Sequence, residues 1–241
     1  MAVIGIPVRY DYSNDNANKS IIYIFDSVRR TIQQAGGEIS LILPTGNIDY
    51  MKIDFENIPE LSEREKIILN KTLDKCDGLF LPGGIKFTPF DQYILDYAIK
   101  KDIPTLGICL SMQMMSCYNE EIDIVKNDTE INHHQLDNDK VHSIKIAKNS
   151  KLYNILGKDE IMVNSIHNYH GTTNHIYKTV ATSPDGIIEA IEYPTATFNI
   201  GLQWHPEKDY ETNPDSKLII NEFLKQAEIY SNKKNKKEAL V

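Results

Sequence analysis

Short apolar runs alternate with segments of helical periodicity through the first two thirds of the chain, and this alternation constrains the fold most. The runs are short enough to be buried strands, and they occupy residues 2–7, 39–43, 77–82 and 104–108. Apolar strands that are separated by helices pair in parallel and are covered on both faces. We therefore predict an α/β fold with a mostly parallel central sheet and helices on both sides.

Three segments between these runs are predicted to be helices, at residues 21–35, 62–75 and 89–101. In the first segment, apolar residues from Ile21 to Ala35 recur at spacings of four and three, which is one helix face. Gly36–Gly37 ends this helix, because glycine accepts the left-handed conformation of a cap. Thr88 caps the third helix, which begins at Pro89.

The pattern changes after about residue 120. Residues 120–140 are polar and are predicted to form a loop or lid. Strand-like runs follow, mostly without helices between them, at residues 141–146, 161–164, 178–183, 187–193 and 198–203. Strands that lack crossover helices pair in antiparallel fashion, so we predict antiparallel additions to the sheet in the C-terminal half.

A last helix is predicted to start at Asn213–Pro214. Its buried face is expected to carry Leu218, Ile219, Phe223, Ala227 and Tyr230. Because no internal repeat or linker divides the chain, residues 1–230 are predicted to form a single domain. Residues 231–241 are predicted to be a flexible polar tail.

Charge and cysteine content limit the class of protein. A net charge of −8 disfavours binding to nucleic acid or to an anionic membrane surface. The chain lacks the long apolar run of a transmembrane helix and the basic start of a signal peptide, so no membrane segment is expected. Three cysteines in no disulfide or metal-binding pattern favour a reducing, cytoplasmic location.

Cys109 stands between an apolar strand and a helix that is predicted to begin near Leu110. A nucleophile at such a turn projects above the sheet edge, and the helix N-terminus favours the reactive thiolate. The turn favours small neighbours: Gly107 suits it, whereas Ser111 places a hydroxymethyl group where glycine fits most easily. Cys109 is therefore a candidate nucleophile, although a strand–cysteine–helix pattern alone is not specific.

His205 and Glu207 follow the last predicted strand in the segment GLQWHPE. A carboxylate bonded to one imidazole nitrogen orients the ring and stabilises the imidazolium. The other nitrogen can then exchange protons with a thiol and a leaving amine. The segment supplies a candidate base and its orienting carboxylate, although an isolated motif of this kind is more often a surface feature.

Gly83 and Gly84 end another predicted strand in the segment FLPGG. Their backbone N–H groups can approach a substrate oxygen and, with the N–H of Leu110, are candidates for an oxyanion hole. A simple strand-ending turn is the alternative if the motif is taken alone. A later loop is predicted to face the substrate, through Asn164, Ser165 and His167.

The remaining histidines form no metal-ligand pattern. His133 and His134 lie in the polar loop, His142 begins a strand, and His170 follows His167 by three residues. No carboxylate or thiol pattern completes a site with them, so no metal is expected.

These segments together resemble the class I glutamine amidotransferases, and more closely their γ-glutamyl hydrolase branch, the peptidase C26-like group that includes the γ-glutamyl-γ-aminobutyrate hydrolases. The resemblance covers nearly the whole chain, through YIFDSVRRTIQQAGGEISLILP, CDGLFLPGG, PTLGICLSMQ, KVHSIKI, VNSIH and GLQWHPE in family order. It implies a flavodoxin-like fold and a triad of Cys109, His205 and Glu207. It also implies an oxyanion hole at Gly84 and Leu110, and a substrate contact from Gln113.

The chain departs from the family pattern around the substrate. Leu110–Ser111 replaces an arginine or similar residue followed by glycine, and 167–169 reads His-Asn-Tyr where the hydrolase branch often has His-His-Gln. Ile85–Phe87 replaces a more acidic, proline-rich continuation. These changes leave the triad in place and leave the identity of the substrate open.

The predicted reaction is cysteine-dependent hydrolysis of a small-molecule γ-glutamyl amide through a thioester on Cys109, without a cofactor. Two alternatives stay open. One is a glutaminase subunit that delivers ammonia to a separate synthetase chain, and the other is a non-catalytic binding protein in which Ser111 distorts the turn. The oligomeric state is also open, with a homodimer among the alternatives.

Overall fold

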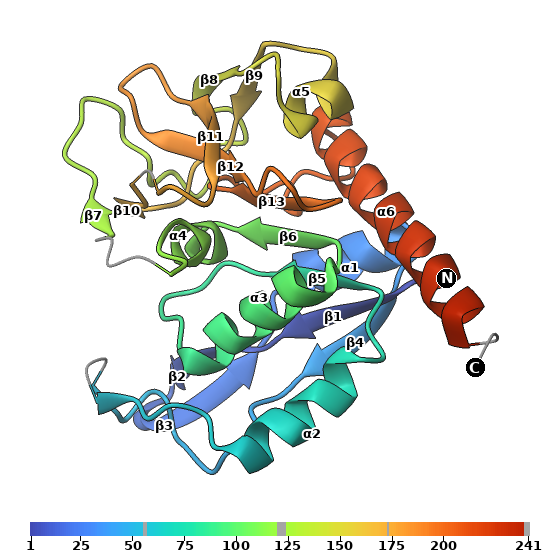
Figure 1. The fold of residues 1–241 in the computed structure, drawn as a ribbon. Helices are drawn as coiled ribbons and strands as arrows, with labels where there is room; N and C mark the ends of the chain where they lie inside the picture. The colour runs from blue at the N-terminus through green and yellow to red at the C-terminus, as the bar shows by residue number, and fades with distance from the viewer. Residues whose placement is uncertain (55–56, 120–123, 173, 239–241) are drawn as a thin grey trace.

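Nine strands pair into one mixed sheet in the computed structural model, which describes residues 1–54, 57–119, 124–172 and 174–238 (Figure 1). Their order is β4 (Glu38–Ile42), β1 (Val3–Pro7), β5 (Gly78–Leu81), β6 (Thr105–Ile108), β13 (Asn199–Leu202), β12 (Ile188–Glu192), β11 (Lys178–Thr182), β8 (His142–Ile146) and β9 (Glu160–Val163). Strands β4 to β13 pair in parallel, and β13 to β9 pair in antiparallel fashion. The predicted parallel centre with antiparallel additions is confirmed.

Helices cover both faces of the parallel half, because its strands carry apolar side chains on both sides. These helices are α1 (Asp26–Gln34), α2 (Glu63–Leu73), α3 (Pro89–Lys101), α4 (Leu110–Ser116) and α6 (Pro214–Glu238). On one face, α1 and α6 pack in a core with Ile4 and Phe80 of the strands. On the other face, α2, α3 and α4 pack in a second core with Ile42 and Leu79.

The antiparallel half contains a helix that the sequence analysis does not predict. α5 (Lys151–Leu156) lies between β8 and β9 and packs against α6. Ser150 caps it by accepting a hydrogen bond from the N–H of Tyr153, and Glu192 of β12 accepts from the first two helical N–H groups. A helix of six residues is too short to show a helical period in the sequence. Its start is defined partly by the carboxylate of Glu192, which is distant in sequence and gives no local signal.

The segment predicted as the first helix begins with a strand instead. β2 (Arg9–Ser13) and β3 (Asn16–Tyr23) form an antiparallel hairpin, and α1 begins only at Asp26. Ile21 and Phe25, which their spacing places on a buried helix face, are 36% and 45% exposed. Their spacing fits a helix by chance: Ile21 pairs with Asp11 of β2, and Phe25 is the residue that precedes α1.

The polar segment 120–140, predicted as a loop or lid, pairs in part with the loop that follows β9. It contains β7 (Val125–Lys126), which pairs with β10 (Tyr169–His170), and an isolated bridge joins His134 to Ile166. Residues 120–123 of this segment lie outside the described residues.

Helix α6 continues to Glu238, past the residue at which the sequence analysis ends the domain. Ile219, Phe223 and Ala227 are buried as predicted, but Leu218 is 45% exposed, which corrects its assignment to the buried face. No helix in the described part of the chain is long and apolar enough to cross a membrane.

Lys234 anchors the end of α6, within residues 231–241 that the sequence predicts to be a flexible tail; residues 239–241 of this tail lie outside the described residues. Its Nζ donates hydrogen bonds to the carbonyls of Asp74 and Cys76 and lies 2.9 Å from Oδ1 of Asp77. The other carboxylate oxygen of Asp77 accepts from the N–H of Val3. The C-terminal helix is thereby linked to the start of β1.

Replacing Lys234 by alanine should lower the free energy of unfolding by about 1–2 kcal/mol, because it leaves the mostly buried Asp77 carboxylate without its cation. Urea denaturation followed by circular dichroism measures this change. The matched control is Lys233→Ala, because Lys233 is exposed and adjacent and its loss should cost less than about 0.5 kcal/mol. Equal effects of the two substitutions would contradict the anchoring role.

Candidate active site

The predicted site residues follow three neighbouring strands of the parallel half. Gly83 and Gly84 follow β5, Cys109 follows β6, and His205 follows β13. Strand β6 lies between the other two and pairs in parallel with both. Because the carboxyl ends of parallel strands meet at one edge of a sheet, segments that are distant in sequence come together here.

Cys109 occupies the tight turn between β6 and α4. Its backbone has φ 52° and ψ −106°, a combination that residues other than glycine rarely adopt. Its N–H donates to the carbonyl of Leu202 at 2.7 Å, which holds the turn against β13. A side chain at Gly107 would come within 2.7 Å of the Met115 sulfur, so the strand requires glycine two residues before the cysteine. The local geometry is that of a nucleophile elbow.

Cys109, His205 and Glu207 lie in series. The Nδ1 atom of His205 is 2.7 Å from Oε1 of Glu207, and the imidazole lies near enough to Cys109 for that side chain to raise its pKa. Gly83 lies against this pair: a Cβ there would be 2.9 Å from Cε1 of His205 and 3.3 Å from Cβ of Cys109. Cys109 is 7% exposed and the His205 side chain 12%, so solvent reaches the pair only over a small area.

The surroundings of His205 favour the protonated imidazole. Burial lowers its pKa, but the charge of Glu207, the nearby Cys109 side chain and the hydrogen bond to Glu207 outweigh burial and raise the pKa to about 10. An imidazolium beside a cysteine is one of the arrangements that activate thiol nucleophiles.

Asn164 positions His205 from the antiparallel half. Its Oδ1 accepts from the N–H of His205 and its Nδ2 donates to the carbonyl of His205, both at 2.9 Å. The sequence analysis predicts a substrate contact for Asn164. In this structure its amide is occupied by the backbone of the proposed base, so contact with a substrate stays a prediction.

Arg9 is a site residue that the sequence analysis misses. Arg9 as a whole is 1% exposed, and its guanidinium donates to the carbonyls of Pro82 and Gly83 at 2.7–3.2 Å. It also forms a salt bridge with the buried carboxylate of Asp91, which in turn accepts from the N–H of Thr88 at the start of α3. The available signal was a charged residue two positions after the first buried strand.

Ser111 fits the turn rather than distorting it. Its Oγ accepts from Nη2 of Arg9 at 2.7 Å and donates to the carbonyl of Pro82 at 2.9 Å. Gly84 lies beside both Arg9 and Leu110: a Cβ there would be 2.9 Å from Cδ of Arg9 and 3.3 Å from Cδ2 of Leu110. The two residues predicted to form the oxyanion hole are therefore neighbours, and their role stays a prediction.

Gln113 and Ser165 make contacts within the protein. The Nε2 atom of Gln113 donates to the carbonyl of Tyr169 at 2.7 Å and to Oε1 of Gln203 at 3.3 Å. Ser165 donates from Oγ to the carbonyl of His133 at 2.9 Å. Their predicted contacts with substrate are untested.

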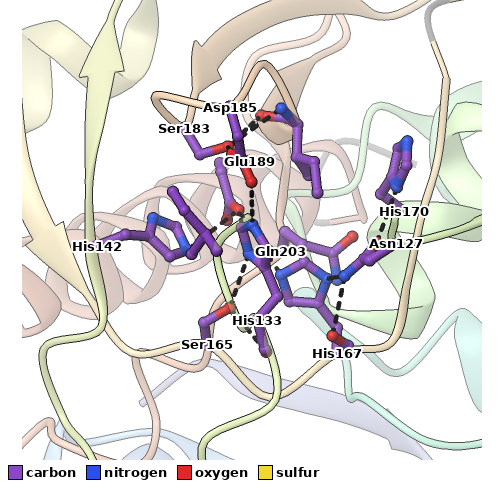
Figure 2. Close-up of polar contacts among 12 residues, drawn as sticks. Asn127, His133, His142, Ser165, His167, His170, Ser183, Asp185, Glu189 and Gln203 are labelled. Carbon is purple, nitrogen blue, oxygen red and sulfur yellow. Dashed lines mark hydrogen bonds and ion pairs between the residues drawn. The ribbon is translucent and has the colours of Figure 1, made fainter. Parts of the chain in front are cut away.

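His167 lies in a group that the sequence analysis does not connect. His133, His142, His167 and Glu189 are buried, and their ligand atoms lie within 4.8 Å of one another (Figure 2). Burial raises the pKa of Glu189 to about 7 and lowers that of His167 to about 4. Among the described residues, these four are placed to hold a metal ion together. Glu189 gives no sequence signal, because it stands in the strand IEAIE.

The chain is similar to known proteins over most of its length. A family model described as Peptidase C26 matches residues 88–207. The provisionally named glutamine amidotransferase PB2B2.05 of Schizosaccharomyces pombe is 33% identical over 198 residues, which cover 68% of this chain and 77% of that protein. The γ-glutamyl-γ-aminobutyrate hydrolase PuuD of Escherichia coli is 23% identical over 192 residues, which cover 66% of this chain and 75% of that enzyme.

A solved structure shares the fold. The glutaminase domain of Trypanosoma brucei CTPS superposes with a TM-score of 0.63 over 94% of both chains, at 18% sequence identity. The flavodoxin-like fold class is therefore confirmed.

Replacing Arg9 by methionine should lower the free energy of unfolding by about 3–5 kcal/mol, because it leaves the buried carboxylate of Asp91 without its cation. The double variant Arg9→Met/Asp91→Asn should lose less than the sum of the two single variants, as a denaturant double-mutant cycle will measure. Arg30→Met is the control, because its exposed ion pair should contribute less than about 1 kcal/mol. Additive losses would contradict the pairing.

Proposed function

This chain belongs to the class I glutamine amidotransferase family, and we propose that it hydrolyses γ-glutamyl amide bonds through a thioester on Cys109. The observation that carries the proposal is the series from Cys109 through His205 to Glu207 at the carboxyl ends of adjacent strands. A sulfur nucleophile, a proton donor and an orienting carboxylate are the groups that acyl transfer requires.

In the first half of the reaction, His205 holds the proton of the Cys109 thiol, and the resulting thiolate attacks the γ-carbonyl carbon of the substrate. The carbonyl oxygen becomes an oxyanion, which the backbone N–H groups of Gly84 and Leu110 stabilise. His205 gives a proton to the leaving nitrogen as the C–N bond breaks, and the amine or ammonia departs. The product is a γ-glutamyl thioester on Cys109.

In the second half, His205 takes a proton from water, which attacks the thioester carbon. The C–S bond breaks, the γ-carboxylate is released, and the Cys109–His205 pair returns to its starting state. Glu207 holds Nδ1 of His205 throughout, so Nε2 stays directed at the reacting groups. A reducing compartment such as the cytoplasm suits this chemistry, because an oxidised thiol cannot attack.

Replacing Cys109 by alanine should reduce glutamate release on the order of 10⁴-fold or more while the chain stays folded, because no other group takes the role of nucleophile. Hydrolysis is measured as glutamate released from γ-glutamyl substrates, and folding by circular dichroism. Cys117→Ala is the matched control, since Cys117 ends the same helix and has no role in the proposed reaction. Full activity in Cys109→Ala would end the assignment.

Delivery of ammonia to a separate synthetase chain is a second candidate function. It is favoured by the 33% identical relative, whose name is that of an amidotransferase. Hydrolysis by the chain alone is favoured by the similarity to PuuD, whose name is that of a hydrolase. Both functions use the same thioester, so they differ in substrate and in partner rather than in mechanism.

A panel of γ-glutamyl amines and free glutamine should separate the two functions. We expect the purified chain alone to release glutamate from at least one γ-glutamyl amine with a higher kcat/KM than from glutamine. The reason is that a hydrolase must bind the leaving amine as well as the γ-glutamyl group. Glutaminase activity that appears only after a synthetase is added would favour ammonia delivery.

A further inference from the structure

Four buried side chains in the antiparallel half direct their polar atoms at one point (Figure 2). They come from separate segments: His133 from the polar loop, His142 from β8, His167 from the loop after β9, and Glu189 from β12. None of these side chains is more than 3% exposed. We call them the His₃Glu cluster.

In each histidine, one ring nitrogen already has an oxygen acceptor. Nε2 of His133 is 3.0 Å from Oδ2 of Asp185, Nδ1 of His142 is 3.1 Å from the carbonyl of Ser143, and Nδ1 of His167 is 3.0 Å from the carbonyl of Tyr169. The Nδ2 donor of Asn127, 3.3 Å from Nδ1 of His167, has another acceptor in the His167 carbonyl at 3.0 Å. The contacts therefore favour the N–H on the outer nitrogens, so in neutral rings the inner nitrogens present lone pairs to the centre.

Most of the nitrogen and oxygen atoms that face the centre of the cluster have no hydrogen-bond partner in the described part of the chain. Nε2 of His142, Nε2 of His167 and both carboxylate oxygens of Glu189 have no hydrogen-bond partner there. Nδ1 of His133 lies 3.2 Å from Oγ of Ser165, whose proton has another acceptor in the His133 carbonyl. Lone pairs that face a buried carboxylate repel it, and a cation at the centre would reverse the sign of every one of these contacts.

The spacing of the cluster fits a tetrahedral ion. Zinc binds imidazole nitrogen and carboxylate oxygen at about 2.0–2.2 Å, which separates the ligand atoms of a tetrahedron by about 3.3–3.6 Å. Oε1 of Glu189 lies 3.4 Å from Nε2 of His142, 3.5 Å from Nδ1 of His133 and 3.7 Å from Nε2 of His167. The four ligand atoms all lie within 4.8 Å of one another, so the histidine nitrogens would move inward by up to about 1 Å to reach bonding distance.

We propose that His133, His142, His167 and Glu189 bind a structural Zn²⁺ ion. The donor set of three imidazoles and one carboxylate suits zinc, and the burial of all four ligands leaves no open position for substrate. Asp185 and the two backbone carbonyls orient the ligands from outside. The ion would join the polar loop and the loop after β9 to two strands of the antiparallel half.

The His₃Glu cluster shares no residue with the proposed triad, but hydrogen bonds link the two. The carbonyl of Tyr169 accepts from Nδ1 of His167 and also from Nε2 of Gln113, which lies on the helix that begins after Cys109. Loss of the ion would therefore loosen a support of the active site without removing a reacting group. The proposal stands whether or not the chain hydrolyses γ-glutamyl amides.

Metal analysis of the full chain tests the site. The protein is purified without chelators, any affinity tag is removed, and zinc is measured by mass spectrometry. We expect about one Zn²⁺ per chain, a lower Tm after the ion is stripped with a chelator, and recovery when Zn²⁺ is restored. Cobalt added to the stripped chain should give the intense visible absorption of a tetrahedral Co²⁺ site, a readout that needs no variant.

Glu189→Gln should lose the zinc and the cobalt spectrum, because an amide is a poor ligand in place of a carboxylate. Glu192→Gln is the matched control: Glu192 is buried on the same strand and holds α5, so its loss can lower stability but should leave zinc bound. A wild-type chain that binds neither Zn²⁺ nor Co²⁺ would overturn the proposal, and protons would then occupy the cluster. Zinc retained in full by Glu189→Gln would also overturn it.

Discussion

Parallel pairing of β6 with β5 on one side and β13 on the other is the constraint on which the rest of the site depends. It sets the carboxyl ends of three strands side by side, so the loops that carry Gly83, Cys109 and His205 have to meet. The hydrogen bond from the N–H of Cys109 to the carbonyl of Leu202 extends this pairing into the strained turn itself. A backbone conformation unfavourable for cysteine persists because strands on both sides hold it.

The buried guanidinium of Arg9 stabilises the loops at the same edge of the sheet. The guanidinium of Arg9 donates hydrogen bonds to carbonyls of the loop Pro82–Gly84 and to the hydroxyl of Ser111, and it forms a salt bridge with Asp91. Three segments are therefore joined by one cation. This contact gives a physical reason for serine where the family pattern has glycine. The side chain of Asn164 forms two hydrogen bonds with the backbone of His205, so the antiparallel half also helps to position the proposed base.

Much of the fold, and the neighbourhood of the three residues proposed as a triad, could be predicted because the signals are local. An apolar strand that ends in Gly-Ile-Cys before a helix favours an elbow, and in this chain the Met115 sulfur of the following helix leaves room only for glycine at Gly107. His205 and Glu207 are two residues apart, so their pairing needs no long-range information. The same local reasoning failed at Ile21, where chance spacing resembled a helix and cross-strand pairing with β2 prevailed, and at Phe25, which only precedes the first turn of α1.

The sequence by itself determined which residues are able to do chemistry and the order of most elements, because side-chain type, helical period and strand length are properties of short segments. Only the tertiary structure decided which of them meet. It brought Arg9 to the PGG loop, set Glu189 among three histidines from other segments, and turned Asn164 to the backbone of His205. Contacts of this kind join residues that are far apart along the chain, and the sheet order that closes those distances is set by the packing of the whole molecule.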